Sequence, residues 1–129
     1  MKEFLKKINV LICTVPLTPK TRGLLSAKLF NDFAFPTYLI NVSRGAVQVE
    51  NDIIRAIEEG KLTGAFLDVF EKEPLPNNSP LWQNPKIKIT PHIASLTYAK
   101  ESIRQALENF RRIKQGENLL NEVNRQNMY

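Results

Sequence analysis

The chain has 129 residues, 43% hydrophobic and 24% charged, which is typical of one soluble globular domain with a sizeable core. No segment approaches the roughly 20 consecutive apolar residues of a membrane-spanning helix, so a membrane partner is not expected. The net charge of +5 comes from dispersed basic residues without a recognised nucleic-acid-binding motif, so nucleic acid is not expected as a partner either.

Short apolar runs alternate with helical patterns along the chain. Four runs predict β-strands, at residues 10–15, 38–42, 65–69 and 87–90. Their near-continuous apolar character is typical of strands buried on both faces, as in a parallel sheet. Strand–helix alternation with short connections implies right-handed β-α-β crossovers, so we expect an α/β fold with about four parallel strands and flanking helices.

Two helices are predicted between the first three strands. Residues 27–33 form a short helical pattern, with Ser26 placed to cap its N-terminus. Residues 52–59 carry an apolar stripe, with Asn51 as the expected N-cap. Gly60 is placed to end this second helix in the left-handed conformation.

The last third of the chain is expected to hold a loop, a long helix and an arm. Residues 70–86 contain four prolines and predict an ordered loop. Residues 97–115 predict a helix that stops at Gly116. Its apolar face comprises Ile103, Leu107, Phe110 and Ile113. The tail, residues 117–129, has enough apolar side chains to dock as an arm.

Three candidate functional side chains each follow a different predicted strand. They are Arg44, Glu73 and His92, and His92 is the only histidine in the chain. Because ligands bind at the carboxyl ends of parallel strands, we expect these side chains to meet there. An Arg offers a planar fork to a carboxylate, and a carboxylate beside an imidazole favours and orients its protonated form. Together they could clamp a carboxylate substrate and transfer a proton.

Each of these residues also has a simpler interpretation. Arg44 alone fits an ordinary surface cation, and Glu73 fits a solvated loop acid, with Glu71 as a competitor for its role. A lone histidine such as His92 is more often structural or solvent-facing. Asp68, at the end of the third run, fits an acid that starts a turn by bonding to its own backbone.

Other chemistries lack support in the sequence. One histidine and one cysteine are too few for a typical metal site, and Cys13 has no partner for an internal disulfide. The single thiol fits a reducing cytoplasm. Ser43 lacks the G-x-S-x-G frame of a serine hydrolase, and the five glycines form no G-x-G-x-x-G phosphate loop.

Several segments together resemble the D-isomer-specific 2-hydroxyacid dehydrogenases. They are CTVPLT at residues 13–18, LINVSRG at 39–45, LDVF at 67–70, EPLP at 73–76 and TPHI at 90–93. SPLWQNP at 79–85 and VNRQ at 123–126 resemble the glyoxylate/hydroxypyruvate reductase subgroup. The resemblance covers nearly the whole chain in the family's order. It implies a partial Rossmann-like sheet that ends in a C-terminal helix.

The resemblance also implies catalytic roles. Arg44 would hold the carboxylate and carbonyl of a small 2-oxo acid. His92 would donate a proton to the carbonyl oxygen while a nicotinamide delivers hydride to the carbon. Glu73 would keep His92 protonated for reduction.

The implied cofactor is NADP or NAD, with NADP favoured by the subgroup resemblance. Residues expected to touch its nicotinamide and ribose are Pro16, Val42, Ser43, Asp68 and Ala94. The phosphate loop that grips the pyrophosphate in this family is missing from the sequence, so nucleotide binding by these 129 residues alone is not expected.

Family members are more than twice this length. The resemblance therefore identifies residues 1–129 as the C-terminal part of a dinucleotide-binding domain, with the family's C-terminal helix and tail at 96–129. Two hypotheses remain, a 2-oxo acid reductase in the full-length parent and a catalytically silent α/β fragment or interaction module. The exposed edge of the first strand, residues 10–15, predicts self-association, for instance as a homodimer.

Overall fold

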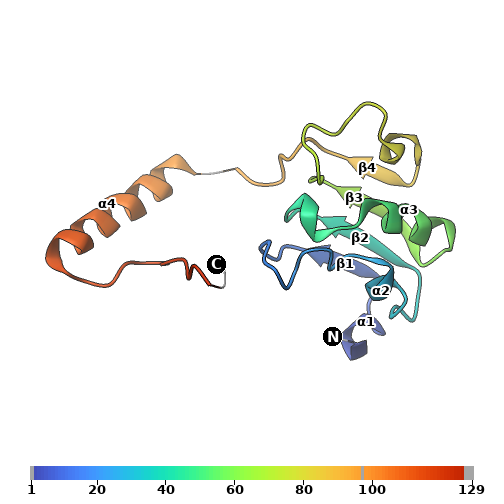
Figure 1. Cartoon of the computed structure of the whole chain (residues 1–129), viewed down its shortest axis with the longest axis horizontal. Coiled ribbons are helices and arrows are strands. Elements are labelled where there is room, and N and C mark those ends of the chain that lie inside the picture. The colour runs from blue at the N-terminus through green and yellow to red at the C-terminus, as the bar shows by residue number, and fades with distance from the viewer. Residues whose placement is uncertain (1, 97, 127–129) are drawn as a thin grey trace. The chain divides into compact units, whose positions relative to one another are not determined.

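A computed structural model describes residues 2–96 and 98–126. The chain divides into two compact units, Met1–Ala94 and Ser95–Tyr129, which are described separately (Figure 1). In the described part of the chain, no helix has the length and apolar character that crossing a membrane requires.

The first unit is built on a four-stranded sheet, with strands in the order β1-β2-β3-β4 (Figure 1). The strands are β1 (Val10–Cys13), β2 (Thr37–Asn41), β3 (Leu62–Leu67) and β4 (Ile87–Ile89). Every neighbouring pair is parallel, and Leu39 in β2 stands in register with Leu11 of β1 and Ala65 of β3. The expected α/β fold with a parallel sheet is confirmed.

Short helices connect the strands. They are α1 (Lys2–Leu5), α2 (Ala27–Phe30) and α3 (Glu50–Glu58), together with 3-10 turns at Gly45–Val47 and Pro80–Gln83. The core lies between the sheet and these helices, because the apolar side chains of α2 and α3 pack against the inward residues of the strands. Its most buried members include Phe30, Leu39, Ile53, Leu62 and Leu67.

The helix starts differ from the sequence predictions. Ser26 does occupy the N-cap position of α2, but its side chain makes no capping hydrogen bond. Instead, the Ala27 N–H donates to Asp52 Oδ2 of α3 at 2.9 Å, so a distant carboxylate supplies the cap. Helix α3 begins before Asn51, and Val49 is its N-cap, so the predicted Asn51 cap is wrong. Gly60 adopts the expected left-handed conformation, with φ +72°.

Strand and loop boundaries also shift. β3 begins at Leu62, three residues before the predicted start, because Leu62 pairs with Thr37 of β2. The predicted proline-rich loop contains the 3-10 turn Pro80–Gln83, in which Ser79 caps the start by accepting a hydrogen bond from the Leu81 N–H. In both places, residues that the sequence pattern assigned to a loop form a strand or a 3-10 turn.

The second unit consists of helix α4 (Ala99–Gln115) and the tail that follows it. The predicted first residue, Thr97, lies outside the described residues. Gly116 ends the helix with φ +70°, as expected. None of the described residues of α4 is buried, and the side chains of its apolar face are 58–64% exposed.

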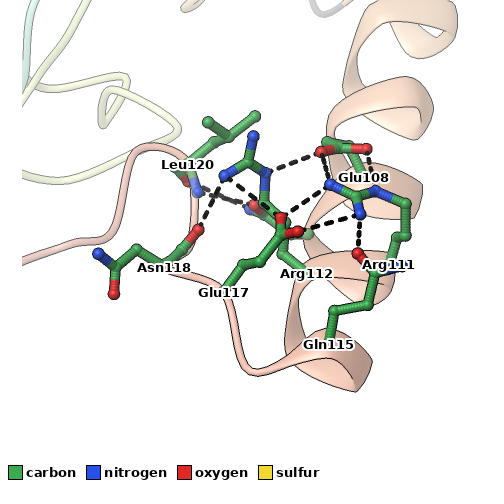
Figure 2. Close-up of polar contacts among 8 residues, drawn as sticks. Glu108, Arg111, Arg112, Gln115, Glu117, Asn118 and Leu120 are labelled. Carbon is green, nitrogen blue, oxygen red and sulfur yellow. Dashed lines mark hydrogen bonds and ion pairs between the residues drawn. The ribbon is translucent and has the colours of Figure 1, made fainter.

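Polar contacts hold the tail along the end of α4, as Figure 2 shows. Arg111 Nη2 lies 2.8 Å from an oxygen of Glu108 and 2.8 Å from an oxygen of Glu117, and its guanidinium also donates to Gln115. Arg112 donates to Glu108 and to the Asn118 carbonyl oxygen.

The Leu120 backbone exchanges two hydrogen bonds with the Asn109 side chain. These contacts are polar, whereas the apolar residues Leu119, Leu120 and Val123 stay 36–61% exposed, so apolar docking of the tail stays a prediction. Residues 127–129 lie outside the described part.

Charge pairing dominates the electrostatics of this unit. Hydrogen bonding to Arg111 lowers the pKa of Glu108 to about 2, with Arg112 acting in the same direction. The same contacts with Glu108 and Glu117 raise the pKa of Arg111. Because the side chains of Glu108, Arg111 and Glu117 are 35–44% exposed, these ion pairs are screened by salt.

Candidate active site

The parallel register places the carboxyl ends of all four strands at one edge of the sheet. Arg44 follows β2, Glu73 lies in the segment after β3, and His92 lies three residues after the end of β4. This sheet edge is where ligands bind in open α/β folds. The candidate site is therefore assembled from connections that the sheet itself positions.

Glu73 and His92 are in direct contact. His92 Nδ1 lies 2.8 Å from Glu73 Oε2, and the other carboxylate oxygen accepts a hydrogen bond from the Phe70 N–H at 2.9 Å. The Glu73–Pro74 peptide bond is cis. The carboxylate is thus oriented at both oxygens, and it fixes the imidazole through one ring nitrogen while Nε2 is left for another partner.

The environment of Glu73 favours its ionised form. Partial burial opposes ionisation, but hydrogen bonds from His92 and from the Phe70 N–H outweigh it and hold the pKa of Glu73 below its usual value. The side chains of His92 and Glu73 are 46% and 36% exposed, so a small molecule can reach the pair. The pair therefore combines a fixed geometry with access for a ligand.

Asp68 fastens the loop that carries His92. Its buried carboxylate accepts hydrogen bonds from the backbone N–H groups of Ile93 and Ala94, both at 2.9 Å, and from the Thr90 hydroxyl. Burial raises the pKa of Asp68, but these hydrogen bonds outweigh it, so the pKa lies below its usual value. These bonds reach across to the loop after β4 rather than starting a local turn at the end of β3. They hold His92 in a left-handed backbone conformation with φ 55°, which is uncommon for a residue with a side chain.

Arg44 stands apart from this pair. Its side chain is exposed, and Nη1 donates to the carbonyl oxygen of Ser43 at 2.7 Å. Within the described residues, the guanidinium forms no hydrogen bond or ion pair with Glu73 or His92. The structure thus brings two of the three predicted catalytic residues into contact and leaves the third at the same sheet edge.

The residues predicted to touch the cofactor fall into two groups. Pro16 and Ala94 are exposed and Val42 is half-buried, so these three can present a surface to a ligand. Ser43 and Asp68 are buried, and their side chains are engaged in hydrogen bonds within the protein. Among the described residues, no group of three or more His, Cys, Asp or Glu side chains is arranged to hold a metal ion.

Sequence reasoning missed two features beside the site. One is a cavity of about 560 Å³ between the segment after β3 and the end of β4, bordered by Glu73, His92 and Trp82. The other is a pair of buried amides, Asn41 and Gln48, that join the ends of β2 and β3. Asn41 carried a usable signal, because it is a polar residue inside an apolar strand and a buried amide needs partners.

The fold and the site define a class of protein, the α/β domains that bind a ligand at the carboxyl edge of a parallel sheet. A family model described as the D-isomer specific 2-hydroxyacid dehydrogenase NAD binding domain matches residues 1–94. The chain belongs to this family. The resemblance inferred from the sequence motifs is confirmed.

Individual relatives agree with the family match. A glyoxylate/hydroxypyruvate reductase A from Photorhabdus laumondii is 47% identical over 89% of this chain, and the chain spans 37% of that protein's length. Two solved structures superpose closely. A D-isomer specific 2-hydroxyacid dehydrogenase from Xanthobacter autotrophicus Py2, in complex with NADPH and MES, has TM-score 0.90 and 41% identity, covering 95% of this chain and 51% of that one. An NADPH-dependent glyoxylate/hydroxypyruvate reductase from Sinorhizobium meliloti, in complex with NADP and sulfate, has TM-score 0.92 and 34% identity, covering 99% of this chain and 42% of that one.

Proposed function

We propose that this chain carries the proton-donating part of an NAD(P)H-dependent 2-oxo acid reductase of the glyoxylate/hydroxypyruvate type. The observation that carries the proposal is the 2.8 Å contact between His92 and Glu73 at the carboxyl edge of the sheet, in a member of this dehydrogenase family. The relatives named as glyoxylate/hydroxypyruvate reductases support the substrate class. We propose further that residues 96–129 are the family's C-terminal helix and tail.

The proposed roles follow from the geometry. The carboxylate of Glu73 occupies Nδ1 of His92, which leaves the Nε2 proton for the carbonyl oxygen of the substrate. Arg44 presents its exposed guanidinium to the substrate carboxylate, which it can hold at two points. With hydride added at the carbonyl carbon and this proton at the oxygen, the 2-oxo acid becomes a 2-hydroxy acid.

The cofactor would lie against the same edge. The exposed aliphatic surfaces of Pro16 and Ala94 and the partly exposed Val42 fit the uncharged nicotinamide and its ribose. Bound NADPH or NADH would supply the hydride. The bound NADP and NADPH of the two solved relatives favour NADP. The side chains of Asp68 and Ser43 would support the residues that touch the cofactor, because their polar atoms already form hydrogen bonds within the protein.

The test is a titration with NADPH and then NADH, followed by reduction of glyoxylate and hydroxypyruvate, on the purified chain alone and on the chain complemented with the N-terminal half that its longer relatives carry. The variants below are compared in whichever form turns over. The variant His92→Gln should lower turnover at least about 100-fold, which is the usual contribution of general acid catalysis. Glu73→Gln should also lower turnover, whereas the matched control Glu71→Gln should not. Absence of both binding and turnover in the wild-type chain would favour the alternative, a catalytically silent α/β module.

Self-association and a cytoplasmic location form the rest of the proposal. β1 is an edge strand of the sheet, and its residues Val10 and Ile12 are 46% and 59% exposed. An exposed apolar edge favours pairing with a second copy of the chain. Light scattering checks this, and a strict monomer at all concentrations would contradict it. The unpaired thiol of Cys13 supports a reducing compartment such as the cytoplasm.

A further inference from the structure

Two buried amide side chains connect the carboxyl ends of β2 and β3. Asn41 Oδ1 accepts a hydrogen bond from the Ser43 N–H at 3.0 Å, and Asn41 Nδ2 donates to Gln48 Oε1 at 2.8 Å. Gln48 Nε2 then donates to the Val69 carbonyl oxygen at 3.0 Å. Asn41 is 0% exposed and Gln48 is 3% exposed, so water does not compete for these bonds. We call Asn41 and Gln48 the amide relay.

The relay has only one consistent direction. A backbone N–H such as that of Ser43 can only donate, and a carbonyl oxygen such as that of Val69 can only accept. Both amides between them must therefore point the same way, with oxygen toward Ser43 and nitrogen toward Val69. A buried network with all partners satisfied is stiff, because any rearrangement leaves a polar group unpaired.

The relay is continuous with the candidate site on both sides. On one side, Arg44 directly follows Ser43, whose N–H the relay holds. On the other side, the relay ends at the carbonyl oxygen of Val69, and the next residue, Phe70, lies so close to Gly45 that a Cβ added to Gly45 would stand 1.8 Å from the Phe70 carbonyl oxygen. The Phe70 N–H in turn donates to Glu73, which contacts His92. An unbroken path of contacts thus runs from the Arg44 segment to the imidazole.

We propose that Asn41 and Gln48 are positioning residues that set the spacing between Arg44 and the Glu73–His92 pair. The reason is chemical, because one 2-oxo acid must present its carboxylate to the guanidinium and its carbonyl oxygen to the imidazole at the same time. In a 2-oxo acid, the carboxylate and the carbonyl carbon are directly bonded to each other. A fixed distance between the guanidinium of Arg44 and the imidazole of His92 therefore selects 2-oxo acids over oxo acids in which these two groups lie further apart. The identity of the substrate in this inference rests on the proposed function, whereas the hydrogen bonds of the relay do not depend on it.

The test removes the relay without touching the site. Gln48→Met keeps the length of the side chain and deletes both hydrogen bonds, and Gln48→Glu keeps the acceptor for Asn41 but deletes the donor to Val69. Thr37→Val is the matched control, because Thr37 is also polar and fully buried but lies at the amino end of β2. Folding of each variant is checked by circular dichroism, and Gln48→Glu decides the result where Gln48→Met does not fold.

Two readouts are measured on the full chain. The first is the NMR signal of the His92 ring, which is unambiguous because the chain has one histidine. It should shift in both Gln48 variants and stay in place in Thr37→Val. The second is the binding of oxamate, a non-reducible 2-oxo acid analogue, which the Gln48 variants should weaken about tenfold.

The outcomes separate this inference from the proposed function. Unchanged His92 ring signals in the folded Gln48 variants would overturn the positioning role. Equal shifts in Thr37→Val would overturn it as well, because the effect would then reflect general loosening of β2. If the wild-type chain fails to bind oxamate, the result favours the catalytically silent module over the proposed function, and the ring signals of the unliganded variants still decide the role of the relay.

Discussion

Helices α3 and α4 have similar amphipathic patterns and opposite surroundings. α3 buries Ile53, Ala56 and Ile57 in the core of the first unit, whereas α4 buries none of its described residues. The first unit is held together by apolar burial and a ladder of parallel strands, and the second by ion pairs and hydrogen bonds at its surface. An apolar stripe in the sequence therefore identifies a helix, but the stability of the region depends on whether that apolar face packs against other apolar residues. The two units should respond to different perturbations.

The largest effect should come from Gly45→Ala. The new Cβ would overlap the Phe70 carbonyl, and backbone cannot move aside as a flexible side chain can. We expect the first unit to lose about 3 kcal/mol or more of its free energy of unfolding. Gly60→Ala is the control, because an added Cβ there meets no atom within 4 Å and only its positive φ opposes the change. Chemical denaturation of both variants measures the difference, and equal losses would contradict the crowding at Gly45.

A core truncation should separate the two units directly. Leu67→Ala opens a cavity at a fully buried position of β3, and the free energy of unfolding should fall by about 3 kcal/mol. Leu107→Ala makes the same chemical change on α4, where the side chain is 64% exposed, and should alter it by about 0.5 kcal/mol or less. Denaturant unfolding followed by far-ultraviolet circular dichroism compares them. A large loss in Leu107→Ala would show that the apolar face of α4 is covered in solution.

Asp68→Asn should have a smaller effect that depends on pH. Near neutral pH it should cost about 2 kcal/mol, because an amide cannot accept all three hydrogen bonds that the carboxylate accepts. The pKa of Asp68 is lowered in the folded state, so the ionised form stabilises the fold above the ordinary value of 3.8, and this stability is lost as the pH falls below it. The free energy of unfolding, measured from denaturation curves at several pH values in this range, should change less with pH in the variant than in the wild-type chain. Equal pH dependence would contradict the lowered pKa of Asp68.

The smallest effect should be confined to the tail of the second unit. The pKa of Glu108 is lowered from 4.5 to about 2, so its ion pairs are present above about 4.5 and are lost as the pH falls towards about 2. Glu108 holds the guanidinium groups of Arg111 and Arg112, which in turn bind Glu117 and the Asn118 carbonyl oxygen of the tail. Acid, or about 1 M salt, should therefore loosen the tail from α4 while the sheet persists. The NMR signal of the Leu120 amide reports the contact, since this amide donates to Asn109. Glu108→Gln should release the tail at neutral pH, and Glu122→Gln serves as the control.

The sequence predicted the sheet well because its signal is local. A continuous apolar run such as the one that contains Leu39 and Ile40 is typical of a strand that is covered on both faces of a parallel sheet. The parallel direction of the strands then places Glu73 and His92 at the same edge of the sheet. The contact between these two residues follows from topology and from the pairing of an acid with the only histidine. The Gly60 and Gly116 stops were predictable because a helix end in the left-handed region favours glycine.

What the sequence did not predict depends on contacts between distant residues. The cap of α2 comes from Asp52 rather than from Ser26 beside it, and no local pattern distinguishes the two. The anchoring of the His92 loop by Asp68 joins residues 25 or more positions apart in the chain. The partners of Gln48 likewise became visible only once β2 and β3 were placed side by side.

The buried thiol at the end of β1 makes the motions of the sheet measurable. Cys13 is the only cysteine, it is 5% exposed, and its sulfur lies 3.4 Å from the Ser43 hydroxyl. A thiol reagent can react with it only while this edge of the sheet is open. At high reagent concentration the labelling rate approaches the rate of opening, and at low concentration it follows the population of the open state. Its dependence on denaturant distinguishes a local separation of β1 from unfolding of the whole unit. The native chain permits this measurement without an engineered label.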